Sequence, residues 1–115
     1  ETDGTFSGFR PMSRSYGNGT YTLHGNEKET VFFVNTSKGS TTFYLPSNPQ
    51  PDQRYEIRKL HSGNSIIINA QNNGDIYVTG SNNPSSQISW TGRRCVTIQY
   101  SKNLDAWVMW FSYEA

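Results

Sequence analysis

Residues 31–110 read as a series of short segments: VFFVN (31–35), TTFYLP (41–46), RYEIRKL (54–60), SIIIN (65–69), DIYVT (75–79), RCVTIQY (94–100) and AWVMW (106–110). The segments are rich in β-branched and aromatic residues, and Gly, Asn, Ser or Pro residues follow them, which is the pattern of strands separated by turns. None has the length and periodicity of an amphipathic helix. The sequence therefore predicts an all-β domain, an antiparallel β-sandwich of about 8–9 short strands.

The connections between these segments predict different structures. Residues 36–40 are polar and of hairpin length, and Gly39 can take a positive φ, so segments 31–35 and 41–45 are expected to form a hairpin. The prolines in residues 46–53 prevent ladder pairing and predict a loop. Residues 80–93 form the longest weakly structured connection, and long polar loops often carry binding residues.

The composition indicates a small core. Apolar residues make up 33% of the chain and the mean hydropathy is −0.72, whereas a globular domain is expected to be about 45–50% apolar. Aromatic residues make up 14%, and each can bury about 150–250 Å². We expect that contacts between identical subunits supplement this core.

Charge and cysteine content exclude several classes of protein. Ten Lys and Arg residues face nine Asp and Glu residues, so the chain has no basic surface of the kind that binds nucleic acid. No apolar run approaches the about 18–20 residues of a membrane helix, so membrane insertion is not expected. The one cysteine, Cys95, cannot form an internal disulfide and lies in an alternating pattern typical of a strand.

The sequence offers little support for enzymatic or metal chemistry. His24 and His61 are isolated from the acidic or cysteine residues that would complete a metal site. Asp75, Asp105 and Glu56 are scattered, and nothing places two carboxyls at the about 5–9.5 Å that glycoside cleavage requires. We therefore expect a binding protein that is not an enzyme and has no metal or cofactor.

Residues 1–15 differ from the remainder of the chain. They are rich in Gly, Ser and charged residues with weak periodicity, and the first residue is Glu1 rather than Met. We interpret residues 1–15 as an entry segment from an upstream body and residues 16–115 as a single β-sandwich domain.

The connection at 80–93 contains the best candidate for ligand contact. Trp90 is predicted to be exposed there, where it could stack on a sugar ring while amide and guanidinium groups bind hydroxyls. The accompanying polar candidates are Asn82, Asn83, Gln87 and Arg93. The alternative is that Trp90 caps the edge of the sandwich or lies between subunits.

The other aromatic residues favour structural roles. Trp107 and Trp110 lie in a segment that is apolar on both faces, which predicts the core or a subunit interface. Half-buried structural positions on strands are expected for Tyr16, Tyr21, Tyr44, Tyr77 and Tyr100.

The order of segments resembles the small β-rich domains near the C-terminal tips of bacteriophage tail fibres and tailspikes. The resemblance is carried by TYTL (20–23), VFFVNTSKGSTTFYLP (31–46), RYEIRKL (54–60), SIIIN (65–69) with its Asn-Gly turn, and the closing pair RCVTIQY (94–100) and AWVMW (106–110). It implies a homotrimer on a fibre of the virion, attached to an upstream fibre body. Its partner would be a glycan, lipopolysaccharide or outer-membrane protein of the host cell surface.

Trimeric assembly would suit weak recognition, because linked copies raise the apparent affinity by about 10²–10⁴. Two alternatives remain. The chain could be a structural trimerisation or chaperone domain of a fibre, or it could be a stand-alone carbohydrate-binding module or small hydrolase.

Overall fold

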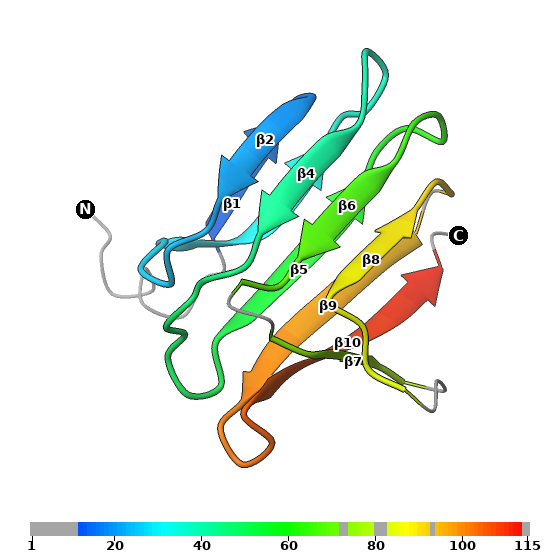
Figure 1. Ribbon diagram of the computed structural model, residues 1–115. Coiled ribbons are helices and arrows are strands. Elements are labelled where there is room, and N and C mark those ends of the chain that lie inside the picture. Colours follow the sequence, from blue (N-terminus) through cyan, green and yellow to red (C-terminus); the bar gives the residue numbers. More distant parts are fainter. Residues whose placement is uncertain (1–11, 72–73, 80–82, 93, 114–115) are drawn as a thin grey trace, which may run out of the picture.

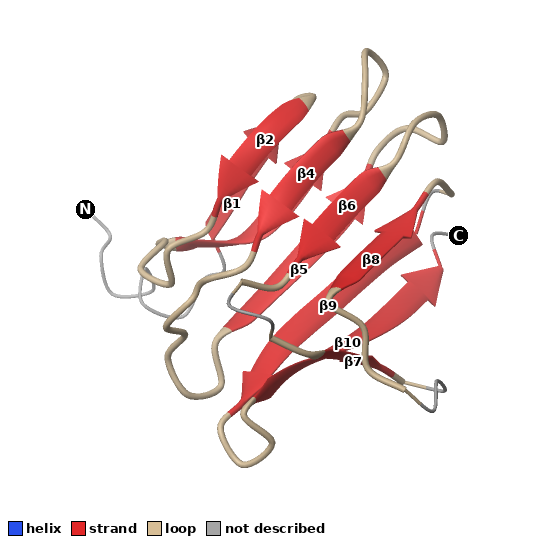
Figure 2. Ribbon diagram, in the orientation of Figure 1, coloured by secondary structure: helices blue, strands red, loops and turns tan. Residues whose placement is uncertain are grey.

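The computed structural model describes residues 12–71, 74–79, 83–92 and 94–113, and these contain ten strands and no helix (Figure 2). The strands are β1 (Met12–Tyr16), β2 (Gly19–Thr22), β3 (Glu29–Val34), β4 (Thr41–Tyr44), β5 (Arg54–Lys59), β6 (Ile66–Asn69), β7 (Ile76–Val78), β8 (Gln87–Trp90), β9 (Arg94–Ser101) and β10 (Ala106–Tyr113). The prediction of an all-β fold is confirmed. The described part of the chain contains no helix long and apolar enough to cross a membrane.

The strands form two sheets that face each other (Figure 1). The first sheet has six strands in the order β1-β3-β5-β9-β10-β7, and the second has four strands in the order β2-β4-β6-β8. From β1 to β6 the chain alternates between the sheets and so winds around the core. We call each full turn of this winding a coil, and each coil adds one strand to each sheet. Successive strands of one sheet then run in the same direction, and the pairs β1–β3, β3–β5, β2–β4 and β4–β6 are all parallel.

The last part of the chain closes this coiled arrangement with antiparallel pairs. β8 pairs with β6, while β9 lies between β5 and β10 and is antiparallel to both. The predicted pairing of segments 94–100 and 106–110 is therefore confirmed. β7 pairs parallel to β10 at the edge of the first sheet.

Two expectations about topology are wrong. The sandwich is of mixed type, with five parallel ladders and three antiparallel ladders among its ten described strands. Segments 31–35 and 41–45 do not form a hairpin, because β3 belongs to the first sheet and β4 to the second. Residues 36–40 instead turn a corner between the sheets.

The corners of successive coils stack at one end of the sandwich, which we call the corner end; it comprises the connections 17–18, 35–40, 60–65 and 91–92 (upper right in Figure 1). Thr36 is completely buried, and its hydroxyl donates to Gly63 O at 2.6 Å. Asn64 Nδ2 donates to Thr36 O at 2.8 Å. These bonds hold residues 36–40 against the β5–β6 connection, so that the chain crosses to the second sheet and does not form a β3–β4 hairpin.

Lys59 completes the corner end. Its side chain is 1% exposed, and Nζ donates to the carbonyl oxygens of His61, Gly63 (3.1 Å) and Thr91 (2.9 Å). Burial lowers the pKa of this ammonium group. One buried cation thus links the β5–β6 corner to the β8–β9 connection.

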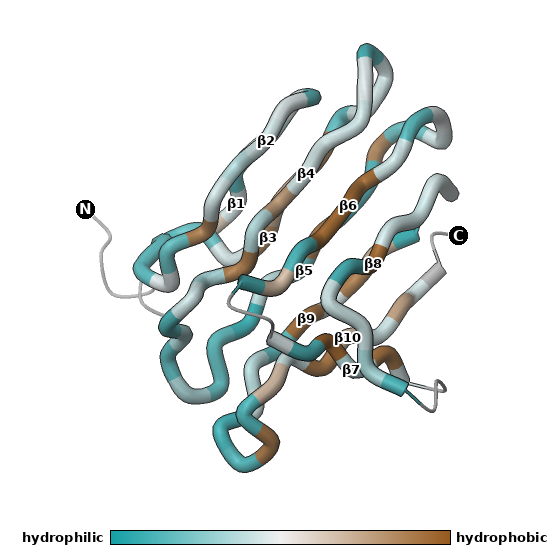
Figure 3. The backbone as a smooth tube through the Cα atoms, in the orientation of Figure 1, coloured by the Kyte–Doolittle hydropathy of each residue, from teal (hydrophilic) through white to brown (hydrophobic). Residues whose placement is uncertain are grey.

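The core lies between the sheets, where alternate residues of each strand point inward. Figure 3 shows hydrophobic residues along the strands and hydrophilic residues in most connections. Tyr16, Phe32 and Phe43 meet with ring centroids 5.1–5.8 Å apart. Fully buried side chains, each contributing about 1.5–3 kcal/mol of stability, include Phe32, Val34, Phe43, Leu45, Ile57, Ile66, Ile68, Ile76, Ile98 and Met109.

The expected boundaries map differently onto the structure. β1 begins at Met12, so residues 12–15 of the expected entry segment are part of the first sheet, while residues 1–11 lie outside the described residues. Within 80–93, residues 87–90 form β8, so this connection is less irregular than predicted. Cys95 is buried in β9, in agreement with its expected place on a strand.

Candidate functional site

The structure places Trp90 away from solvent. Trp90 is the last residue of β8, pairs with Ile66, and is 6% exposed. Its ring packs edge-to-face on Phe111 with centroids 5.4 Å apart, and its Nε1 donor has no hydrogen-bond partner among the described residues. The prediction of an exposed Trp90 in a loop is therefore wrong, because pairing with β6 turns the indole toward the space between the sheets.

The polar residues predicted beside Trp90 are described only in part. Asn83 and Gln87 are exposed, and Gln87 pairs with Asn69 at the start of β8. Asn82 and Arg93 lie outside the described residues. Ligand binding at 80–93 stays a prediction, and the buried indole offers it no open stacking face.

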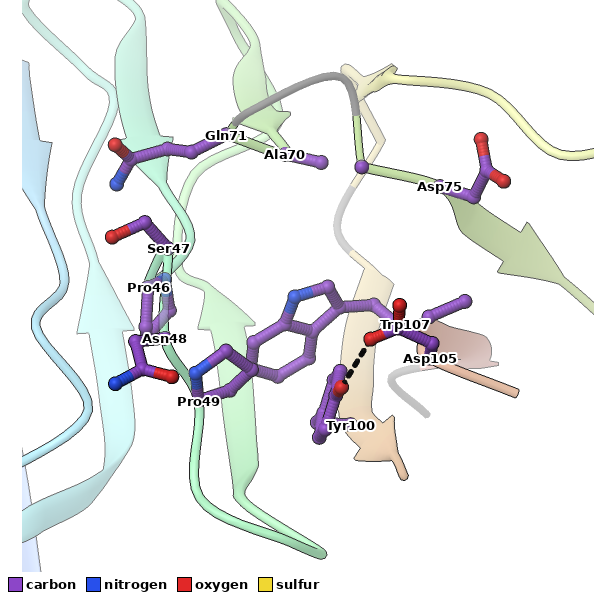
Figure 4. A pocket seen from close by; sticks show the side chains of 12 residues that line it. Pro46, Ser47, Asn48, Pro49, Ala70, Gln71, Asp75, Tyr100, Asp105 and Trp107 are labelled. Atoms are coloured by element: carbon purple, nitrogen blue, oxygen red, sulfur yellow. Dashed lines mark hydrogen bonds between the residues drawn. The ribbon is translucent and has the colours of Figure 1, made fainter. Parts of the chain in front are cut away.

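A pocket of about 250 Å³ lies at the opposite end of the sandwich from the stacked corners. We call this the loop end, which comprises the described residues of four connections, 23–28, 45–53, 70–71 with 74–75, and 102–105. Figure 4 shows the Trp107 indole in the middle of the pocket, between the Pro46–Pro49 segment and the turn that carries Asp105. The pocket is lined by Pro46, Ser47, Asn48, Pro49, Ala70, Gln71, Gly74, Asp75, Tyr100, Asp105, Ala106 and Trp107.

Aromatic residues form the floor of this loop-end pocket. Trp107 is the second residue of β10 and is 4% exposed, so only a small part of its indole reaches the pocket. Tyr55 lies nearly parallel to it at 6.2 Å, and the half-buried Tyr100 meets it edge-on at 5.5 Å. The Trp107 amide also donates to Asp75 O at 3.0 Å, which fixes the β6–β7 connection against β10. Trp107 is thus a core residue, as predicted, that also forms the pocket floor.

The rim of the pocket is polar. The Tyr100 hydroxyl donates to Asp105 Oδ1 at 2.6 Å, and this hydrogen bond raises the pKa of Tyr100. Asp105 has φ = 50°, a left-handed conformation that Asp tolerates better than most residues. Among the described residues, the side chains of Ser47, Asn48 and Asp75 have no hydrogen-bond partner and can bind a ligand.

A second network holds the loops beside the pocket. The Glu27 carboxylate accepts from the His24 amide (2.6 Å), the Gly25 amide (3.0 Å) and the Tyr55 hydroxyl (2.7 Å). Burial raises the pKa of Glu27, but these hydrogen bonds together outweigh it and leave the pKa below 4.5. Burial, together with the Glu27 contact, raises the pKa of Tyr55 far above its usual value. Gln53 Nε2 donates to the same hydroxyl at 3.1 Å, which ties the proline loop to β5.

A larger hollow of about 550 Å³ lies around β2, but its acidic groups are already engaged. Glu27 belongs to the network with Tyr55, and Glu29 lies 3.9 Å from Arg14. In the loop-end pocket, by contrast, the Asp75 carboxylate has no hydrogen-bond or ion-pair partner among the described residues, and it lies at one site with Asn48 and the Tyr100 ring. The loop-end pocket is therefore the better candidate for a binding site.

The acidic residues named from the sequence are divided between two faces. Asp75 and Asp105 line the loop-end pocket, whereas Glu56 pairs with Arg58 on the outer face of the first sheet. The described residues contain no grouping of three or more His, Cys, Asp or Glu side chains that could hold a metal. Sequence reasoning missed this pocket because three distant connections form it. The sequence features that could have indicated the pocket are the proline-rich loop and the polar turn before Trp107.

No protein-family model matches this chain, and no curated protein matches it. The geometry of the loop-end pocket is therefore the main basis for a functional proposal.

Proposed function

We propose that this domain binds a glycan of the bacterial cell surface and that the loop-end pocket holds the sugar. The observation that carries the proposal is the half-buried Tyr100 ring, backed by the buried Trp107 indole, together with unpartnered polar side chains at one concave site. Sugars offer both apolar ring faces and hydroxyl groups, so they match sites with a few oriented polar groups around aromatic rings. A volume of about 250 Å³ suits a small ligand such as one sugar unit.

The biological setting that we propose is the distal tip of a bacteriophage tail fibre, assembled as a homotrimer. The resemblance in strand order supports this setting, and so does the separation between a closed corner end and a loop end with a pocket. A single small pocket gives weak binding, with millimolar affinity corresponding to about −4 kcal/mol. Three linked copies would raise the apparent affinity enough for adsorption to cells.

Adsorption of the full chain to host cells tests this function. Asn48→Ala removes an exposed rim side chain and is expected to weaken binding about fivefold per site, the effect of one lost hydrogen bond. The control is Gln87→Ala, which alters the connection that the sequence favoured and should leave adsorption unchanged. Loss of adsorption with Gln87→Ala alone would place the binding site at 80–93 and reject the loop-end pocket.

A structural trimerisation domain is the second candidate function, and one observation favours it. Val31, Phe33, Val108 and Trp110 lie half-buried on the outer face of the first sheet, a surface that a second subunit could cover. Arg54 lies 5.5 Å from the Trp110 ring on the same face. Sedimentation at micromolar concentration tests assembly, and a trimer whose adsorption is unaffected by Asn48→Ala would favour this second function.

A further inference from the structure

We propose that the loop-end pocket selects sugars without acidic groups, either neutral sugars or amino sugars, and rejects sugars that carry carboxylate or phosphate. This inference rests on the proposed function, because it concerns the ligand of the same pocket. It follows from the charges and hydrogen-bonding groups that line the site.

The described residues that line the pocket carry only negative charge. Among the described residues that line the pocket, Asp75 and Asp105 are the charged ones, and there is no Lys, Arg or His with them. Lys102 lies in the same turn as Asp105, but it is exposed and not part of the lining. A bound carboxylate or phosphate would therefore meet two negative charges with no facing cation, and because Asp75 and Asp105 are exposed, this repulsion is strongest at low ionic strength.

The hydrogen-bonding pattern points the same way. The Asp105 carboxylate accepts one bond from Tyr100 through Oδ1, and the Asp75 carboxylate accepts none from the described residues. Ionised carboxylates only accept hydrogen bonds, so the ligand must donate. Sugar hydroxyls and ammonium groups are donors, whereas carboxylates and phosphates are acceptors.

The aromatic floor explains why the ligand is a sugar rather than a free cation. Tyr100 is half-buried beside Trp107, so one side of the pocket is apolar and suits the C–H face of a pyranose ring. The Asp105 carboxylate lies beside the Tyr100 ring and is hydrogen-bonded to its hydroxyl, while Asp75 lies farther from Tyr100 (Figure 4). A sugar ring against Tyr100 could therefore donate from its edge to these carboxylates.

Binding of the full chain to an oligosaccharide array tests the inference. The array carries three classes of equal length: neutral hexose oligomers, hexosamine oligomers with free amino groups, and oligouronates. At low ionic strength we expect the best neutral or amino members to bind at least about tenfold more tightly than any oligouronate, equivalent to about 1.4 kcal/mol. Preference for amino over neutral members that fades with added salt would identify the ammonium group as the contact.

Charge-removing variants assign the effect to the pocket. Asp75→Asn and Asp105→Asn keep the shape of the side chain, and Asn tolerates the left-handed backbone at residue 105. Each substitution should reduce the ratio of the affinity for neutral sugars to the affinity for oligouronates at least about threefold. Asp52→Asn is the matched control, because Asp52 is also left-handed (φ = 61°) but lies outside the pocket lining, and it should leave this ratio unchanged.

The outcomes separate this inference from the function beneath it. Oligouronates that bind as tightly as neutral sugars would overturn the selectivity while leaving a glycan-binding function intact. An unchanged affinity ratio in both aspartate variants would also overturn it. Absence of binding to every class would reject the proposed function and the selectivity together.

Discussion

The two ends of this sandwich are built from similar polar residues but are held together differently. At the corner end, Thr36, Lys59 and Asn64 bond to backbone carbonyls of neighbouring coils, and the first two are almost fully buried. At the loop end, side chains bond mainly to other side chains or to amides, as in the contacts of Tyr55 and Glu27. The corner end is thus closed, while the loop end retains a pocket with unpartnered rim groups.

This difference separates stability from recognition. The corner bonds connect coils that are 25–32 residues apart in the chain, so they hold the stack of strands together. The loop end can then vary in side-chain chemistry because the strands beneath it are already fixed. Binding residues commonly lie on loops that a rigid scaffold positions in this way.

The largest expected effect comes from breaking the corner end. Lys59→Met keeps the apolar stem but removes the donor to three carbonyl oxygens, so we expect the free energy of unfolding to fall by about 2–3 kcal/mol. Urea denaturation measures this change, and sugar binding by the folded protein should be unaffected. Lys38→Met is the control, because Lys38 is exposed in the neighbouring corner and should shift stability by less than about 0.5 kcal/mol. Equal effects of the two variants would contradict the role assigned to Lys59.

A smaller, pH-dependent effect is expected at the loop end. The pKa of Glu27 is lower in the folded protein than its ordinary value of 4.5, so its ionised form stabilises the fold above pH 4.5 and this contribution is lost as pH falls through the folded pKa. Glu27→Gln should lower the free energy of unfolding by about 1 kcal/mol at pH 7.

Urea titrations at pH 7 and pH 3 measure this dependence. The gap between wild type and Glu27→Gln should shrink at the lower pH, while Asn26→Gln in the same connection gives a pH-independent difference. A gap that widens toward pH 3 would show that the Glu27 pKa is raised instead.

The smallest effect is expected for Trp90→Phe. The substitution removes a buried N–H that has no partner, and this gain offsets part of the lost packing on Phe111. We expect the free energy of unfolding to change by less than about 1 kcal/mol, and sugar binding to be unchanged. If this folded variant loses binding, the site lies near β8, and the contrast between the two ends no longer describes recognition.

Strand positions could be predicted from the sequence because they depend on local patterns. Segments such as 54–60 and 94–100 alternate clearly and became β5 and β9. Sheet assignment could not be predicted in the same way. A five-residue link allows either a hairpin or a corner, and the bonds of Thr36 to Gly63 and Asn64, 27 and 28 residues away, accompany the corner.

Single residues of the candidate site could be recognised in the sequence, but their grouping into one pocket could not. Asp75, Asp105 and Trp107 were each noticed in the sequence, but their convergence depends on the pairing of β7 with β10. Trp90 misled the prediction because flanking polar residues suggested a loop, while its pairing with Ile66 places it in a strand. The expectation of half-buried tyrosines also fails in part, since Tyr16 is buried whereas Tyr44 and Tyr77 are 38% and 37% exposed.

The alternation of coils between two sheets has a consequence for how such a domain can evolve. Each connection between β1 and β6 leaves one sheet and enters the other, so lengthening residues 46–53 would extend a surface bulge without shifting the register of β4 against β6 or of β3 against β5. Insertions in surface connections also add little entropic cost, about 0.6 kcal/mol for each doubling of length. The architecture therefore allows the loops at one end of the molecule to diversify during evolution while the strand pairing stays the same.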